Sequence, residues 1–169
     1  TATAILRRYF DDIGASLRVY IPQRIEEGYG PTIPAMEQLA KEGTTTLLMV
    51  DCGTTAFESL QEAKNLGMDV IVIDHHMSQA SLPVATAVIN PNRLDENSSL
   101  THLCAAGLSF VFMVALHRRL RQEGWFEGQT EPDLRQYLDL VALGTVCDVM
   151  QLTGLNRAFV SQGLKVMAR

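Results

Sequence analysis

Short apolar runs alternate with amphipathic segments over the first half of the chain. Apolar runs rich in β-branched residues predict strands at 46–50, 70–73 and 85–89, and a further strand at 17–21. Apolar positions at helical spacing predict helices at 4–13, at 35–42 with a first turn at 32–34, and at about 56–66. Helices that alternate with short apolar strands are typical of βαβ units, which form a parallel sheet.

The pattern changes after a polar loop at about 95–99. From there the apolar positions predict helices at 103–123, about 132–143 and about 156–167. We therefore predict an α/β fold, with a parallel sheet flanked by helices over about 1–95 and a helical part over about 96–169. A length of 169 residues fits one domain, or one lobe of a larger protein.

Composition narrows the class of protein. No apolar run reaches the roughly 18 residues of a membrane span, and the first residues do not resemble a signal peptide. The three cysteines are widely spaced and form no CxxC motif, which favours a reducing cytoplasm. The net charge of −5 argues against a protein that coats nucleic acid non-specifically. It does not exclude an enzyme that acts on a phosphate polymer, because bound divalent cations invert the local charge.

Ionisable side chains follow two of the predicted strands directly. The strand at 70–73 runs into Asp74, His75 and His76, and the strand at 46–50 runs into Asp51. Ligands bind beyond the carboxyl ends of the strands in open parallel sheets. These residues therefore predict a metal-dependent site at that edge of the sheet.

Hydrolysis of a phosphodiester needs a nucleophile and charge neutralisation, and two metal ions about 3.5–4 Å apart supply both. Mn²⁺ and Mg²⁺ favour carboxylate ligands, and Mn²⁺ accepts imidazole. The candidate ligands are Asp51, Asp74, Asp148 and His75. His76 then faces the substrate phosphate. We include Asp148 because it follows an apolar helix end, where an unpaired carboxylate is costly to bury.

Structural interpretations compete with this one. Asp51, Thr54 or Thr55 could cap the next helix. Cys52 and Cys147 each adjoin a candidate acid, so a thiolate zinc site is conceivable, although the spacing is not that of a structural zinc site.

Three segments together resemble the DHH phosphoesterase superfamily: Asp-His-His at 74–76, Val-Asp-Cys-Gly-Thr at 50–54 and Gly-Thr-Val-Cys-Asp-Val at 144–149. Further pieces at 27–30, 90–92, 103–110 and 155–164 are similar to its branch of single-stranded-DNA exonucleases. The resemblance extends over nearly the whole chain.

The resemblance implies a role for each matching residue. It implies metal ligands at Asp51, His75 and Asp148, catalytic roles for Asp74 and His76, and a contact from Arg24 to the 5′-terminal phosphate. Asp74 supports the ligating histidine or lies near the metal, and His76 lies against the scissile phosphate. Arg24 suits a bidentate phosphate contact, but a solvated arginine on a loop is the competing interpretation.

Other residues carry weaker signals for nucleic acid. The arginines at 118, 119 and 121 form a basic patch that could follow a DNA backbone, although a solvent-facing helix surface is favoured. Phe110, Phe112 and Trp125 could stack on bases, but core positions are favoured for the two phenylalanines.

The activity implied by the resemblance is 5′→3′ exonuclease cleavage of single-stranded DNA, with Mn²⁺ or Mg²⁺, in recombination and repair. Its implied partners are a helicase and a single-strand-binding protein. The alternatives are a small-substrate phosphoesterase, acting on oligonucleotides or pyrophosphate, and a non-catalytic scaffold. The family's first motif, Asp-x-Asp-x-Asp-Gly, is expected immediately before Thr1. We therefore expect a partial catalytic domain with an incomplete two-ion site, no later DNA-binding domains and little activity of its own.

Overall fold

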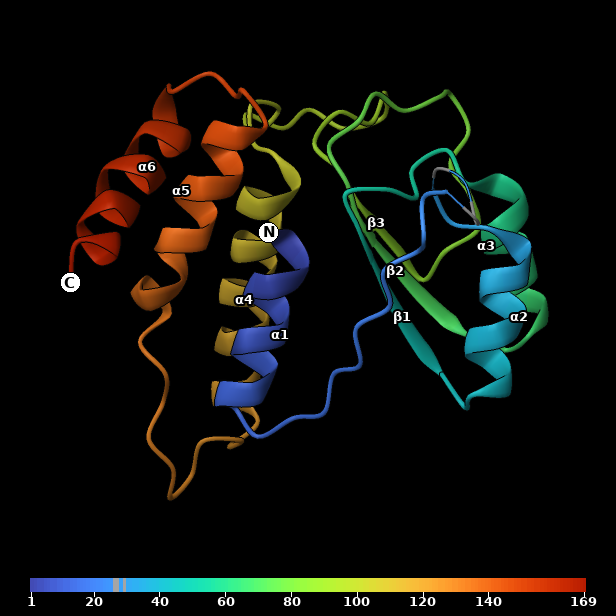
Figure 1. The fold of residues 1–169 in the computed structure, drawn as a ribbon, viewed down its shortest axis with the longest axis horizontal. Coiled ribbons are helices and arrows are strands. Elements are labelled where there is room, and N and C mark those ends of the chain that lie inside the picture. The colour runs from blue at the N-terminus through green and yellow to red at the C-terminus, as the bar shows by residue number, and fades with distance from the viewer. Residues whose placement is uncertain (26–27, 29) are drawn as a thin grey trace. The chain divides into compact units, whose positions relative to one another are not determined.

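The computed structural model describes residues 1–25, 28 and 30–169. The chain forms two compact units, each with its own core. Residues 20–101 contain the sheet, and residues 1–19 join residues 102–169 in a helical unit (Figure 1). No helix in the described part of the chain is long and apolar enough to cross a membrane.

In the described part of the sheet unit, three parallel strands form a sheet in the order β1-β2-β3. The strands are β1 (Thr46–Val50), β2 (Asp69–Ile73) and β3 (Ala87–Ile89). Thr46 pairs with Asp69, and Ile71 pairs with Ala87. The predicted α/β class with a parallel sheet is confirmed, and the strand at 46–50 has the predicted bounds.

Two helices, α2 (Ile33–Lys41) and α3 (Phe57–Asn65), lie beside each other on one face of this sheet (Figure 1). The Thr32 side chain begins α2 by accepting a hydrogen bond from the Ala35 N–H at 3.3 Å. Apolar side chains of the strands and helices form the core of the unit, among them Met36, Met49, Leu60, Val70 and Val72.

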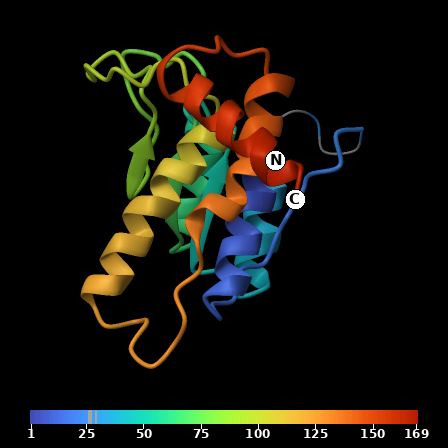
Figure 2. The same cartoon turned by 90° about the vertical axis from the view of Figure 1, so that its left-hand side faces the viewer.

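The helical unit contains four α-helices. They are α1 (Ala2–Asp12), α4 (Ala105–Gln122), α5 (Leu138–Cys147) and α6 (Gly154–Met167), with a 3₁₀ turn, η1 (Leu134–Tyr137), before α5. Figures 1 and 2 show α5 and α6 as antiparallel neighbours. Tyr9, Met113, Tyr137 and Val141 are fully buried in the core of this unit.

The strand predicted at 17–21 is wrong. Residues 15–23 form neither a helix nor a strand, although apolar and polar side chains alternate there. The alternation indicates a strand only where a neighbouring strand satisfies the main-chain groups. Here the Leu17 carbonyl instead accepts a hydrogen bond from the Arg7 guanidinium at 2.9 Å.

Candidate metal centre

The candidate site begins where β1 and β2 end. Asp51 follows β1, and Asp74, His75 and His76 follow β2. The ladder continues past the strands, because the Asp51 N–H donates to the Ile73 carbonyl at 2.9 Å and the Asp74 N–H donates to the Ile89 carbonyl at 3.0 Å. These bonds bring Asp51 and the Asp-His-His segment to the same edge of the sheet.

Asp51 leaves the strand in the left-handed region, with a φ of 65°. Aspartate tolerates this region better than most residues. Gly53 follows with a φ of 114°, and a Cβ there would lie 3.0 Å from Val72 Cγ1. The tight turn presents the Asp51 side chain, which is 57% exposed, to His75, whose Nε2 lies 3.2 Å from Asp51 Oδ1.

The capping interpretations are wrong for this turn. Helix α3 has Ala56 at its N-cap and no side-chain capping bond, so neither Asp51 nor a threonine caps it. The Thr54 hydroxyl instead accepts a hydrogen bond from Asn90, and the Thr54 N–H donates to Asp74 at 3.0 Å.

Asp74 is buried and its carboxylate is fully engaged. Oδ1 accepts bonds from the His75 N–H at 2.8 Å and from His76 Nδ1 at 2.7 Å, while Oδ2 accepts the bond from Thr54. Burial alone would raise the pKa of Asp74, but the hydrogen bonds from His76 and Thr54 outweigh burial and lower that pKa. Asp74 is therefore ionised at neutral pH. An ionised Oδ1 accepts a hydrogen bond from the His76 Nδ1–H, which leaves His76 Nε2 open for a ligand.

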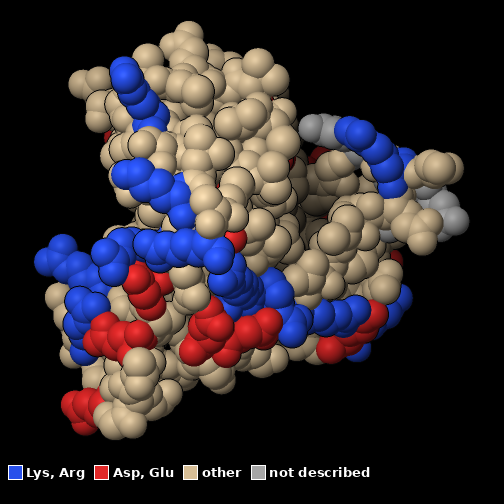
Figure 3. Space-filling model, turned by 60° about the vertical axis from the view of Figure 1, so that its left-hand side comes forward, with Lys and Arg blue, Asp and Glu red and all other residues tan. Residues whose placement is uncertain are grey.

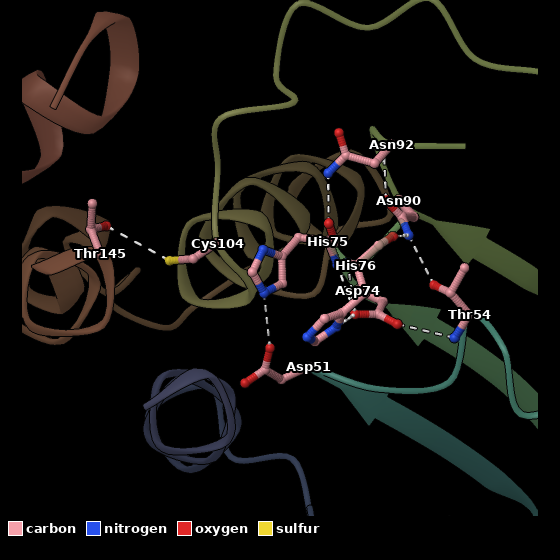
Figure 4. Close-up of polar contacts among 9 residues, drawn as sticks. All are labelled: Asp51, Thr54, Asp74, His75, His76, Asn90, Asn92, Cys104 and Thr145. Atoms are coloured by element: carbon pink, nitrogen blue, oxygen red, sulfur yellow. Dashed lines mark hydrogen bonds and ion pairs between the residues drawn. The ribbon is translucent and has the colours of Figure 1, made fainter. Parts of the chain in front are cut away.

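Asp51, His75 and His76 form a group that could hold a metal ion (Figure 4). Each offers one ligand atom, and these atoms all lie within 4.8 Å of one another. One carboxylate oxygen with two imidazole nitrogens is a donor set for a divalent transition metal, and the carboxylate is a ligand type that Mn²⁺ favours. Asp74 lies behind this group and orients His76.

Two asparagines complete the surroundings of the histidines (Figure 4). Asn90 follows β3 directly, and its side chain donates to the His76 carbonyl at 2.8 Å. The Asn92 side chain donates to the His75 carbonyl at 2.6 Å. In the sequence, the Asn-Pro-Asn segment is recognisable only as a family motif. Its place at the third strand end is the signal that could have linked it to the site.

Asp148 belongs to the helical unit and ends helix α5. The Val149 N–H donates to the Val146 carbonyl and the Met150 N–H to the Thr145 carbonyl, which is a Schellman turn. Val149 stands with a φ of 55° at the position where glycine is usual. The Asp148 side chain is exposed, so the expected burial among apolar residues is wrong. Its role as a ligand stays a prediction.

Arg24 lies in the sheet unit and is exposed. The family piece at 27–30 that follows it lies partly outside the described residues, which omit 26, 27 and 29. The contact from Arg24 to a 5′-phosphate therefore stays a prediction.

The thiolate interpretation finds no support at Cys52. Burial, together with the nearby Asp74 and Asp51 carboxylates, raises the pKa of the Cys52 thiol to about 11. Without a metal this thiol is protonated at neutral pH, and Cys52 offers no ligand atom to the group of Asp51, His75 and His76.

Three of the candidate DNA contacts on α4, namely Phe110, Arg119 and Arg121, have partners within the protein. Phe110 is buried and packs edge-on against Phe159, with ring centroids 5.4 Å apart. Arg121 pairs with Glu131, and Arg119 pairs with Glu123. Figure 3 likewise shows acidic side chains beside the basic ones on the face that it presents. Such a mixed surface favours the solvent-facing interpretation over a track for DNA.

Comparison with known proteins identifies the class. Residues 1–145 match the DHH family, N-terminal domain, and the chain belongs to this family. Among its relatives, the single-stranded-DNA-specific exonuclease RecJ of Escherichia coli is 39% identical over 167 residues, which cover 97% of this chain and 29% of that protein. RecJ of Dickeya dadantii is 40% identical over 153 residues, or 89% of this chain and 27% of that protein. The chain thus spans less than a third of the length of these relatives.

Solved structures agree with this assignment. A crystal structure of exonuclease RecJ bound to manganese superposes with a TM-score of 0.81 and 36% identity, over 97% of this chain and 39% of that one. RecJ from Thermus thermophilus in complex with Mn²⁺ gives a TM-score of 0.74 and 33% identity, over 97% of this chain and 22% of that one.

Proposed function

We propose that the protein containing this chain is a metal-dependent exonuclease that degrades single-stranded DNA from the 5′ end and releases mononucleotides. The observation that carries the proposal is the donor group of Asp51, His75 and His76 at the strand ends. It stands in a chain whose relatives are single-stranded-DNA-specific exonucleases and whose solved relatives bind manganese. The proposed setting is recombination and repair in the cytoplasm, with a helicase and a single-strand-binding protein as partners.

The proposed roles follow from the contacts. Asp51 and His75 hold the ion, which when bound supplies Lewis-acid charge and a water of lowered pKa. Asp74 keeps His76 oriented, and His76 Nε2 approaches the scissile phosphate. Arg24 is the proposed contact for the 5′-phosphate.

Three donors do not complete a site for two ions, because Mn²⁺ and Mg²⁺ prefer about six ligands each. We propose Asp148 as one further ligand. The remaining ligands come from water and from other parts of the protein. We therefore expect little hydrolysis by residues 1–169 alone.

Hydrolysis of 5′-phosphorylated single-stranded DNA by the full-length protein tests the proposal, with Mn²⁺ and with a chelator. We expect Mn²⁺-dependent release of mononucleotides. Asp51→Ala should reduce the rate at least about a hundredfold and retain most DNA binding, because it removes a proposed ligand. Asp69→Ala, at the exposed start of β2, is the matched control and should keep the wild-type rate.

Wild-type turnover in Asp51→Ala would refute the metal assignment. If the wild-type protein left DNA intact but hydrolysed short oligonucleotides or pyrophosphate, it would be a small-substrate phosphoesterase. If it hydrolysed neither class of substrate, the scaffold interpretation would replace the enzyme.

A further inference from the structure

We propose that Asn90 and Asn92 are positioning residues of the metal centre, which fix the main chain of both histidines and thereby set the affinity for the ion. The inference rests on the proposed metal role of His75. The side-chain amide nitrogen of each asparagine bonds to a histidine carbonyl, so each acts through the histidines.

The carbonyls of the two histidines are the points of contact. Asn92 Nδ2 donates to the His75 carbonyl at 2.6 Å, and Asn90 Nδ2 donates to the His76 carbonyl at 2.8 Å. Consecutive peptide planes of the Asp-His-His segment are therefore held by two side chains of the segment that follows β3. Rotation of either plane would turn the attached imidazole away from Asp51.

The side chain of Asn90 has no spare bonding capacity at its amide nitrogen. Besides the His76 carbonyl, Nδ2 donates to Thr54 Oγ1 at 2.9 Å. Its Oδ1 accepts a bond from the Asn92 N–H at 2.8 Å, which places the second asparagine. Asn90 is buried, so these bonds are formed away from solvent, where losing a partner is most costly.

The same amide connects to the acid behind the site. The Thr54 hydroxyl accepts the hydrogen bond from Asn90. The N–H and the hydroxyl of Thr54 both hydrogen-bond to Asp74. Asp74 in turn holds His76 Nδ1. A single hydrogen-bonded path therefore leads from Asn90 through Thr54 and Asp74 to the imidazole, while Asn90 also holds the same histidine's carbonyl.

This arrangement predicts a specific defect. Losing a residue that orients a metal ligand typically costs 10–100-fold in metal affinity. Asn92 is the better position to change because it is only half-buried, and its side chain makes a single bond to the site. Asn92→Ala removes the donor to the His75 carbonyl. The ligand atoms of His75 and Asp51 are still present in this variant, so any loss of affinity comes from their positioning.

The test is Mn²⁺ binding to the full-length protein, measured by electron paramagnetic resonance of the free ion. We expect Asn92→Ala to weaken binding about tenfold or more, and Asn92→Gln, which keeps an amide donor, to recover part of the loss. Asn97→Ala, in an exposed part of the same loop, is the matched control and should bind as the wild type does. Thermal unfolding without metal should change little in Asn92→Ala. If Asn92 had only a structural role, Asn92→Ala would lower the midpoint of thermal unfolding, and the folded variant would keep the wild-type affinity for Mn²⁺.

Wild-type affinity in Asn92→Ala would overturn the inference. If that variant did not fold, Asn92→Ser would give the same test with a smaller change. Failure of the proposed function would look different, because wild type and Asp51→Ala would then bind Mn²⁺ equally weakly. Binding by wild type, loss in Asp51→Ala and no loss in Asn92→Ala would refute only the positioning role.

Discussion

Asp74 determines the electrostatics of the strand-end site although it offers no open ligand atom. Its carboxylate is 2% exposed and accepts bonds from Thr54, His75 and His76. These bonds favour the charged form, so the folded state holds this carboxylate ionised at a lower pH than the unfolded chain does. The stability that Asp74 supplies is therefore fully present above the ordinary aspartate pKa of about 3.9, and it is lost as the pH falls through the lower folded pKa.

Asp74→Asn tests this dependence. We expect the free energy of unfolding at pH 7 to fall by roughly 3 kcal/mol, because buried donors lose a charged acceptor. The difference from wild type should shrink as the pH is lowered below about 4. Urea unfolding between pH 3 and pH 7 measures both effects. Asp69→Asn, an exposed position on the same strand, should stay within about 0.5 kcal/mol of wild type throughout. A constant difference at every pH would contradict the role of the charge.

The sequence predicts that Asp51 and the Asp-His-His segment follow two strands, and the structure places them there, while their roles as ligands stay predictions. Asp51 and His75 were predicted as ligands because they follow apolar strands, and the structure brings them within 3.2 Å. The inward position of Asp74 and the contacts of Asn90 and Asn92 were not predicted. They depend on the path of three turns after three strands, and hydrophobic periodicity carries no information about that path.

At the scale of elements, close approach of helices explains why small residues lie at one crossing. Helices α5 and α6 pack as an antiparallel pair, and Gly163 of α6 faces Leu138 and Ala142 of α5. A Cβ at Gly163 would lie 2.2 Å from the Leu138 carbonyl oxygen and 2.5 Å from Ala142 Cβ. The Leu138 carbonyl oxygen is a backbone atom and cannot turn aside as a side chain can, so the two helices would have to separate.

Gly163→Ala should therefore destabilise the helical unit by about 2 kcal/mol or more, although alanine favours a helix by up to about 1 kcal/mol. Chemical unfolding followed by circular dichroism measures the change. Ser161→Ala, on the exposed side of the same helix, should be neutral or slightly stabilising. A stabilised Gly163→Ala variant would show that the two helices are not packed this closely.

The predicted elements differ from the observed ones where contacts with distant parts of the chain determine whether an element forms. The strand at 46–50 and the helix ending near 167 were predicted well, because apolar positions at a regular period mark them. The strand at 17–21 failed because its alternation cannot show whether a partner strand is present. The amphipathic pattern of α1 predicted a helix, but not that it would pack against α4 and α5, which lie about a hundred residues later.

At the scale of the whole chain, the net charge of −5 is compatible with an activity on a polyanion, because bound divalent cations invert the local charge. Asp51 and His75 are the proposed ligands of one ion, and the proposed second ion needs acidic ligands from elsewhere. Asp148 is the candidate that the family motif supplies, and it lies at the exposed end of α5.

Asp148→Asn should change the number of ions bound rather than abolish binding. We expect the wild-type full-length protein to bind two Mn²⁺ ions and the variant to retain the ion held by Asp51 and His75, with the second ion bound at least about tenfold more weakly. Equilibrium titration with Mn²⁺ measures stoichiometry and affinity together. Asp133→Asn, an exposed acid of the same unit, is the matched control and should bind as wild type does. Unchanged stoichiometry and affinity in Asp148→Asn would remove this residue from the metal site, because the neutral amide oxygen of asparagine binds a hard cation more weakly than a carboxylate does.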